Sequence, residues 1–584
     1  MIFSVCSPIY HSQFEKITQQ HQMEDSIIAC ANPTCRLEAA TNQSHLSCKG
    51  CLLVKYCGRD CQVQHWGEHK KYCKSPLMKA EWKPDWATTG RTPAFVGDNG
   101  PSQVVFGGNK YLWGNVPAID VLQLAKNEGR NYDRDVHLLF AASGDLRNVI
   151  ETVSSIPETF QKSISMVLND RDPEIVIRNA ILLLISLTAE EIKEAVDCMI
   201  HIFYSAFLQK NHLDILQGKI RALVADVVQK VDNKPLKSLQ AKSWTFGSRI
   251  LRLILTKEVW CKLLERLDVP INLTVQKAHQ IRTAVTLAPS RRDYRERRYM
   301  CVFPAHRLSQ ERYRMDGLLL PFGASRAQFD TPNPTLFESN QSWPLKDSSD
   351  PLEGWNIFDI LNKTPRAASS DVYGKLYFYL QYAFKAFIEK SITLNASFQL
   401  FNVNAEELSK HLESETFSRI EVSNICDAGY LGCAKTLFSL GPLLQKKSTN
   451  PHATLIMLFM NAIEENLTPA DQAAAFRNSM AQVVKFLPPP VFRTHPYDPC
   501  YLKYMLAADL FRDNDRFFNK YMTKWRFEEC GRLANMAMKK NTVVEKWPMR
   551  LKKKAGQPGA KEEFDLLFGS GHGNERYVEW QTLE

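Results

Sequence analysis

A cluster of cysteine and histidine residues near the N-terminus restricts the fold of this chain more than any other feature. Seven of the fifteen cysteines fall between Cys30 and Cys73. Zinc takes four thiolate or imidazole ligands in tetrahedral geometry, so eight ligands make two sites. Read along the chain, the ligand pairs are Cys30/Cys35, Cys48/Cys51, Cys57/Cys61 and His69/Cys73. The pattern predicts a short segment that two zinc ions hold together.

The spacing within the pairs supports a metal site over a set of ordinary buried thiols. Cys48 and Cys51 form a C-x-x-C knuckle, whose tight turn lets both thiolates reach one ion. Cys57/Cys61 and His69/Cys73 are four residues apart, which places each pair on one face of a helical turn. A redox C-x-x-C motif would need no further cysteines. His65 lies one helical turn before His69 and is the alternative histidine ligand.

The order of these pairs, ending in "HWGEHKKYC", resembles the MYND-type zinc finger. In that family the first and third pairs share one zinc, and the second and fourth share the other. The resemblance implies His69 as the ligand rather than His65, and a C-x4-C first pair departs from the usual C-x2-C of the family. The implied sites are Cys30, Cys35, Cys57 and Cys61 for one ion, and Cys48, Cys51, His69 and Cys73 for the other.

Four protein ligands at each ion leave no open position, so we expect both zinc ions to be structural. MYND fingers bind short proline-containing peptides, and the resemblance therefore implies a protein partner. Gln64 and Trp66 are the candidates for contact with that peptide, although Trp66 equally suits packing in a small core. Tyr56 is expected to pack in the core. We also expect metal chelation to unfold residues 28–75 and to leave the rest of the chain intact.

Composition sets the class of the whole chain. It has 584 residues, 44% of them hydrophobic, and a formal net charge of +10, which suits several globular domains and does not favour nucleic acid as a partner. Apolar runs stay shorter than the roughly 20 residues of a membrane span, and the N-terminus lacks a secretory pattern. We therefore expect a cytoplasmic or nuclear protein that binds neither a membrane nor a small-molecule ligand.

Two strand–turn–helix units in tandem predict a parallel sheet. The first has a strand over 136–142 and a helix over 146–156, and the second has a strand over 164–169 and a helix over 174–188. The plan returns within 397–412 and 417–444, with a further strand in 453–465, after an insertion that is helical at both ends. The predicted fold class is multi-domain α/β, a small two-zinc finger followed by a Rossmann- or methyltransferase-like domain.

The predicted division of the chain follows from these patterns. It comprises an N-terminal tail (1–27), the finger (28–75), a linker (76–116), the first half of the Rossmann-like domain (117–190), a mainly helical insertion (191–390), the second half (391–500) and a helical C-terminal region with a basic tail (501–584).

Several blocks of this region carry a second resemblance. "LLFAASGDLRNVIETV", "LNDRDPEIVIRN" and "FSRIEVSNICDAGYLG" look like a largely fungal family of unknown function, domain of unknown function 4470, which is often fused to a MYND finger. The first block also resembles the N-terminal region of axonemal dynein preassembly factors. These resemblances imply a fold and leave the activity open.

Gly144 and Asp170 are the candidates for holding a nucleoside cofactor. Gly144 lies in the turn after the first predicted strand, and Asp170 ends the second, where Rossmann-type sheets place a glycine turn and a ribose-binding acid. However, Phe140, Ala142 and Leu146 stand where the S-adenosylmethionine pattern has an acid and two glycines. Helix capping or a place at a solvated strand end is therefore the preferred explanation of Asp170.

Motifs for nucleophilic, phosphate-binding and zinc-protease chemistry are not found in the sequence. It therefore favours a non-catalytic interaction adaptor. A divergent S-adenosylmethionine-dependent methyltransferase is the first alternative, and a transcriptional regulator is the second.

Two basic segments have to be assigned. Five arginines crowd residues 291–298, where pairing with nearby acids is the preferred interpretation and phosphate binding the alternative. Residues 550–563 are basic and predict a solvated tail or a nuclear import signal.

Overall fold

The computed structural model describes residues 30–35, 46–96, 105–364, 367–488, 497–568 and 570–583. The predicted N-terminal tail, 1–27, lies outside these residues. Among the described helices, none has both the length and the apolar content that crossing a membrane requires.

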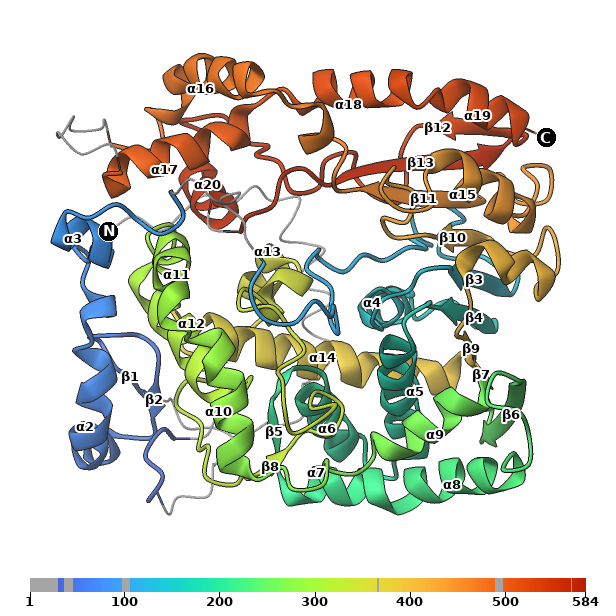
Figure 1. Ribbon diagram of the computed structural model, residues 1–584, viewed down its shortest axis with the longest axis horizontal. Helices are drawn as coiled ribbons and strands as arrows, with labels where there is room; N and C mark the ends of the chain where they lie inside the picture. Colours follow the sequence, from blue (N-terminus) through green and yellow to red (C-terminus); the bar gives the residue numbers. More distant parts are fainter. Residues whose placement is uncertain are drawn as a thin grey trace.

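A single large sheet organises the main body, and its strands run down one side of the molecule in Figure 1. The described part of the chain contributes nine strands to it. In spatial order they are β12 (Met536–Lys539), β13 (Arg576–Thr582), β11 (Thr454–Phe459), β10 (Arg419–Glu421), β3 (Val136–Phe140), β4 (Ile164–Asn169), β9 (Ser397–Phe401), β7 (Arg249–Thr256) and β6 (Leu239–Phe246).

Neighbouring strands from β11 to β7 run parallel, and antiparallel pairs finish the sheet at both edges. The α/β prediction is confirmed. β4 has the predicted bounds, β3 is two residues shorter than predicted, and the ambiguous segment 453–465 contains β11. The helix expected after β9 is a 3₁₀ helix, η5 (Ala405–Lys410).

Two regions contribute strands that the sequence analysis does not anticipate. The insertion holds the β6–β7 pair, and β7 lies beside β9 in the sheet. The C-terminal region supplies β12 and β13, which extend the sheet beyond β11. The outermost strands, β6 and β12, are partly exposed and show a weaker apolar pattern than the buried central ones. β13 is buried but carries the charged residues Arg576 and Glu579, which interrupt its apolar pattern. The sheet therefore draws on segments from 136 to 582.

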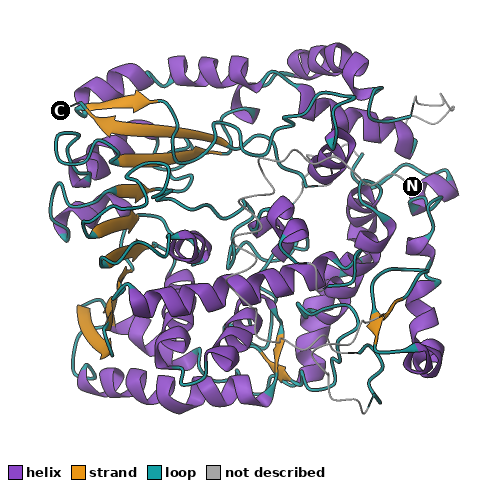
Figure 2. Cartoon of the chain, turned by 180° about the vertical axis from the view of Figure 1, so that it is seen from behind, coloured by secondary structure: helices purple, strands orange, loops and turns teal. Residues whose placement is uncertain are grey.

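Both faces of the central strands are buried, which explains their continuous apolar runs. In β3, Leu138 and Phe140 pack into one hydrophobic cluster, and Leu139 packs into the cluster on the opposite face. Figure 2 shows helices on either side of the column of strands.

Helices that pack around the larger cluster include α4 (Arg147–Ser155), α5 (Pro173–Thr188), α6 (Ile192–Tyr204), α8 (Arg221–Lys230), α9 (Lys257–Glu265) and α14 (Val372–Thr393). The smaller cluster is covered by α15 (Cys433–Leu440), α18 (Asn514–Lys524) and α19 (Phe527–Leu533). The remaining helices of the body are α7 (Lys210–Ile215), α10 (Val275–Thr286), α11 (Arg292–Tyr299), α12 (Pro304–Asp316), α13 (Ile357–Asn362), α16 (Pro469–Val483), α17 (Pro499–Ala508) and α20 (Ala560–Phe568). A small antiparallel pair joins β5 (Phe207–Leu208) to β8 (Thr331–Pro332).

The predicted linker and basic tail both pack against the body. After the finger, α3 (Asp85–Thr89) buries Trp86 in a cluster with Phe95 and Met300, and Trp113 enters the main core. In the segment 550–563, the Glu563 carboxylate accepts hydrogen bonds from the backbone amides of residues 552 and 553, next to the start of α20. The backbone of this segment is thus held to α20, while Lys552, Lys553 and Lys554 are exposed to solvent as predicted.

A buried ion pair ties β10 to the loop before β3. Arg419 is fully buried, and its guanidinium lies 2.8 Å from the side chain of Glu128, which is 2% exposed. Replacing Glu128 with Ala leaves a buried cation without its partner, and we expect the free energy of unfolding to fall by about 3–5 kcal/mol.

Denaturant unfolding measures this change. The control is Glu407→Ala, because Glu407 pairs with Lys410 in an exposed i,i+3 pair, where the loss should stay below about 1 kcal/mol. Equal losses in the two variants would contradict a structural role for the buried pair.

Candidate functional site

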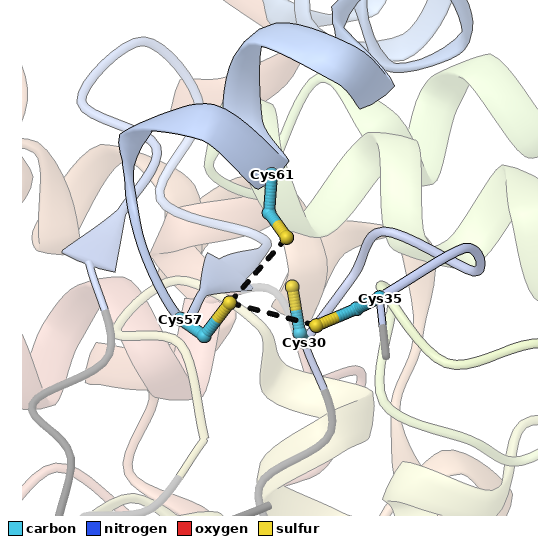
Figure 3. Close-up of side chains that lie close together, drawn as sticks. All are labelled: Cys30, Cys35, Cys57 and Cys61. Atoms are coloured by element: carbon cyan, nitrogen blue, oxygen red, sulfur yellow. Dashed lines mark hydrogen bonds between the residues drawn. The ribbon is translucent and has the colours of Figure 1, made fainter. Parts of the chain in front are cut away.

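The first cysteine cluster joins two segments of chain. Cys30 and Cys35 come from a loop, Cys57 follows β2 (Lys55–Tyr56), and Cys61 lies in the first turn of α2 (Arg59–Cys73). The Sγ atom of Cys57 lies 3.6 Å from that of Cys35 and 3.4 Å from that of Cys61. In Figure 3 the four side chains converge on one point.

The second cluster joins the turn after β1 (Leu46–Ser47), which pairs with β2 in a short hairpin, to the second half of α2. The His69 Nε2 atom is 3.3 Å from Cys48 Sγ and 3.5 Å from Cys51 Sγ, and Cys48 Sγ is 3.9 Å from Cys73 Sγ. A Cβ atom on Gly50 would come within 3.0 Å of Cys73 Sγ, so the knuckle needs glycine there.

Both clusters fit zinc. Within the described residues, these are the two groups whose ligand atoms lie within 4.8 Å of one another. Four sulfur ligands at about 2.3 Å from a zinc ion stand about 3.8 Å apart in a tetrahedron, close to the separations seen. The donor sets, four thiolates in one and three thiolates with an imidazole in the other, are those of structural zinc sites. The prediction of two structural zinc ions is confirmed.

The structure decides between the two histidines. His65 lies outside both clusters, and its Nδ1 atom is 3.0 Å from the Tyr56 hydroxyl. His69 is buried, and burial lowers its pKa to about 4, which keeps the imidazole neutral as a ligand requires. Tyr56 is fully buried, in line with its predicted packing role.

The unusual spacing of the first pair is explained by Asn32, which the sequence analysis does not single out. The backbone amide of Cys35 donates to the Asn32 carbonyl over 3.1 Å, and the Asn32 side-chain oxygen accepts from the Thr34 amide. This turn returns Cys35 toward Cys30. The Asn-Pro dipeptide at 32–33 is the sequence signal for such a turn.

The two peptide-contact candidates lie on α2. Trp66 is 38% exposed, and its ring is 5.9 Å from that of His69 and 5.9 Å from the Lys74 ammonium. Gln64 is exposed, and its side-chain oxygen accepts a hydrogen bond from Asn32 over 3.0 Å. Trp66 therefore contacts a zinc ligand with part of its ring and leaves the rest open to solvent.

The finger also packs against the body, unlike the independent module that the sequence suggests. Leu53 and Val54 of the finger share one hydrophobic cluster with Leu308 of α12 and with Phe322. The Arg312 guanidinium lies over the ring of Tyr72 at 4.7 Å and over that of Phe322 at 4.3 Å. Because these contacts cross between the two parts, loss of zinc would also uncover apolar surface on α12.

Gly144 and Asp170 both line a cleft of about 900 Å³ at the carboxyl edge of the sheet. The Asp170 carboxylate accepts hydrogen bonds from the amides of Gly144 and Asp172, at 3.1 and 2.8 Å. Gly144 has a positive φ of 53°, which suits glycine in this turn. The structure thus brings the two candidates together and gives the Asp170 carboxylate a local structural role.

The arginine-rich segment pairs with acids. Arg291 contacts Asp347 at 2.8 Å, and Arg298 contacts Glu353 at 2.8 Å. Asp293 and Glu296, within the segment, pair with Arg91 and Arg292. These ion pairs agree with the preferred interpretation of the segment.

Comparison with known protein families gives two matches. Residues 30–73 match the model of the MYND finger, and residues 112–208 match that of a domain of unknown function, DUF4470. The first match spans both metal clusters, and the second spans the units from β3 to β5. The chain therefore carries both domains. Searches of the curated proteins and of the solved structures return no match to this chain.

We expect the full chain to hold two zinc ions, and Cys61→Ser to lower this to one or fewer, because α2 carries ligands of both clusters. Elemental analysis of purified protein measures the content. Cys301→Ser is the control, since Cys301 is outside the clusters. Two ions retained by Cys61→Ser would refute its assignment as a ligand.

Contact between finger and body can be tested at Phe322, which is 3% exposed. Phe322→Ala should lower the free energy of unfolding by about 3–5 kcal/mol through loss of buried area and the cavity that it leaves, while the zinc content stays at two. The control is Phe438→Ala on α15, where the ring is 50% exposed and the change should be small. Unfolding in denaturant that matched the unchanged protein would argue against this contact.

Proposed function

We propose that this protein is a zinc-binding interaction adaptor. Its finger recruits a partner through a proline-containing peptide, and its α/β body serves as a non-catalytic scaffold. The observation that carries the proposal is the division of the finger surface. One part packs on α12 through the shared hydrophobic cluster, while Trp66 and Gln64 stay exposed on α2.

This division suits peptide recognition. A partly exposed tryptophan held against a buried histidine is a rigid apolar platform, and tryptophan is enriched among the residues that dominate binding energy. Metal coordination fixes the backbone of α2, so binding of a peptide costs little conformational entropy in the finger. Rings of this kind also form the grooves that proline-rich segments enter.

The strand order of the body supports the proposal that it is a Rossmann-like scaffold. If β3, β4, β9, β10 and β11 are counted as strands one to five, their spatial order is 3-2-1-4-5, which is that of a doubly wound nucleotide-binding sheet. The same order supports the alternative, a divergent methyltransferase. That alternative requires transfer of a methyl group from S-adenosylmethionine, which a scaffold does not perform.

The fungal type of the protein and a likeness to dynein preassembly factors remain predictions within this proposal, as do the domain limits. We also place the protein in the cytoplasm or nucleus, where thiols stay reduced and available to zinc. The arginine ion pairs of residues 291–298 favour a protein partner over nucleic acid.

Trp66→Ala is expected to weaken binding to an array of proline-containing peptides at least about tenfold, as for a dominant interface residue. Fluorescence anisotropy on the binding peptides measures the affinity. Elemental analysis should still find two zinc ions.

The matched control is Trp525→Ala, which removes an indole that is 42% exposed and lies on the body. His69→Ala, which removes a zinc ligand, should abolish binding. Unchanged affinity in Trp66→Ala, or equal losses in both tryptophan variants, would contradict the proposed docking face.

A further inference from the structure

The cleft at the carboxyl edge of the sheet contains a buried carboxylate with unused bonding capacity. Glu421 is the last residue of β10 and lines the cleft, and its side chain is buried, with the residue 3% exposed. Its Oε1 atom accepts a hydrogen bond from the Ser423 amide over 2.7 Å. Within the described residues its Oε2 atom is buried and makes no hydrogen bond of normal geometry, although the Asn148 side chain lies close enough to favour the ionised carboxylate. Such an atom costs free energy unless a ligand or water supplies a donor.

The position of Glu421 is where α/β sheets bind ligands. β10 lies beside β3, and the strand order turns back between them, since β4 follows β3 on one side and β11 follows β10 on the other. In open parallel sheets, ligands bind outside the carboxyl ends of the strands at such a reversal. A volume of about 900 Å³ is also within the range of small-molecule sites.

The cleft does not suit phosphate. Among its described lining residues, acidic side chains outnumber basic ones by five to three. Arg147 is already paired with Asp145 at 2.7 Å, and Lys435 lies 3.6 Å from Glu406 at the rim. The third basic residue, Arg171, is exposed to solvent.

Three backbone amides of the turn after β3 are also engaged in hydrogen bonds. Those of Ser143, Gly144 and Arg147 donate to Asn169, Asp170 and Asp145 respectively. Phosphate-binding turns need such amides unengaged. A ligand here has to offer donors to a carboxylate and carry no phosphate.

The remaining walls suit an aromatic base. Ile425, Leu458 and Met460 give the cleft apolar surface beside its polar edge. Burial raises the pKa of Glu421 to about 7, although the Ser423 amide, the nearby Arg147 charge and the Asn148 side chain all act to lower it. Strand-end carboxylates in this fold class accept hydrogen bonds from ribose hydroxyls. Asp170 stands in the usual place for that role, but its carboxylate already accepts hydrogen bonds from two backbone amides. The Glu421 carboxylate accepts one backbone amide, on Oε1, which leaves Oε2 as the acceptor for a ribose hydroxyl.

We propose that this cleft binds a phosphate-free nucleoside, whose ribose hydroxyl donates a hydrogen bond to the Glu421 carboxylate. This goes beyond the adaptor function, because the site is formed by residues of the body, whereas the proposed peptide face lies on α2 of the finger. It also revises the sequence-based expectation that the chain takes no small-molecule ligand.

Calorimetric titration of the full-length, zinc-loaded protein tests the proposal, with adenosine and ATP as the probes. Adenosine should bind at least about tenfold more tightly than ATP, because the triphosphate brings negative charge against the cleft's carboxylates. Absence of heat from adenosine at millimolar concentration, where a Kd of about 1 mM is measurable, overturns the proposal. Equal or tighter binding of ATP overturns it as well.

Two variants then locate the contact. Glu421→Gln keeps an oxygen for the Ser423 amide and exchanges the other acceptor for a donor, so adenosine affinity should fall at least about tenfold. Glu406→Gln removes a negative charge at the rim and should change affinity less than about twofold.

Thermal unfolding checks that both variants are folded. Equal affinities for Glu421→Gln and the unchanged protein, or equal losses in the two variants, overturn the assignment of Glu421. Peptide binding by the finger should be the same in all three proteins, so this test and that of the adaptor function fail separately.

Discussion

Burial of both faces of the parallel strands is the constraint on which the rest of this structure depends. Leu138 and Leu139 pack into hydrophobic clusters on opposite faces of the sheet, so side chains within these strands are not accessible to a ligand or a partner protein. Binding sites are therefore expected at the ends of the strands and on the exposed faces of the surrounding elements. The carboxyl edge holds the cleft with Glu421. The finger packs on α12 and Phe322.

The finger has little core of its own, and two sources of stability replace it. Zinc coordination joins the loop at Cys30 and Cys35 to α2, and the second cluster joins the knuckle at Cys48 to the end of the same helix. The body then covers the apolar side of the hairpin. This arrangement fixes the orientation of α2, so the exposed part of Trp66 is presented from a rigid support.

Several arginine side chains of this protein form ion pairs within the structure. The arginines of residues 291–298 meet Asp347, Glu353 and acids of their own helix, and Arg419 is buried against Glu128. A formal net charge of +10 therefore does not correspond to an open basic surface over this segment. Buried pairs of this kind hold elements in register more than they add net stability. Glu421 is different, since among the described residues it has no ion pair and its Oε2 atom makes no hydrogen bond of normal geometry.

The metal ligands and the first strand–helix units were determined by the sequence alone. Ligand chemistry depends on residue type and short spacing, and β4 is a continuous apolar run between turn residues. Contacts between segments that are far apart in the sequence were revealed only by the tertiary structure. It brought β13 next to β11 and placed Phe322 under the finger. Glu421 reads in the sequence as an ordinary acid, because burial and a missing partner are properties of packing between segments hundreds of residues apart.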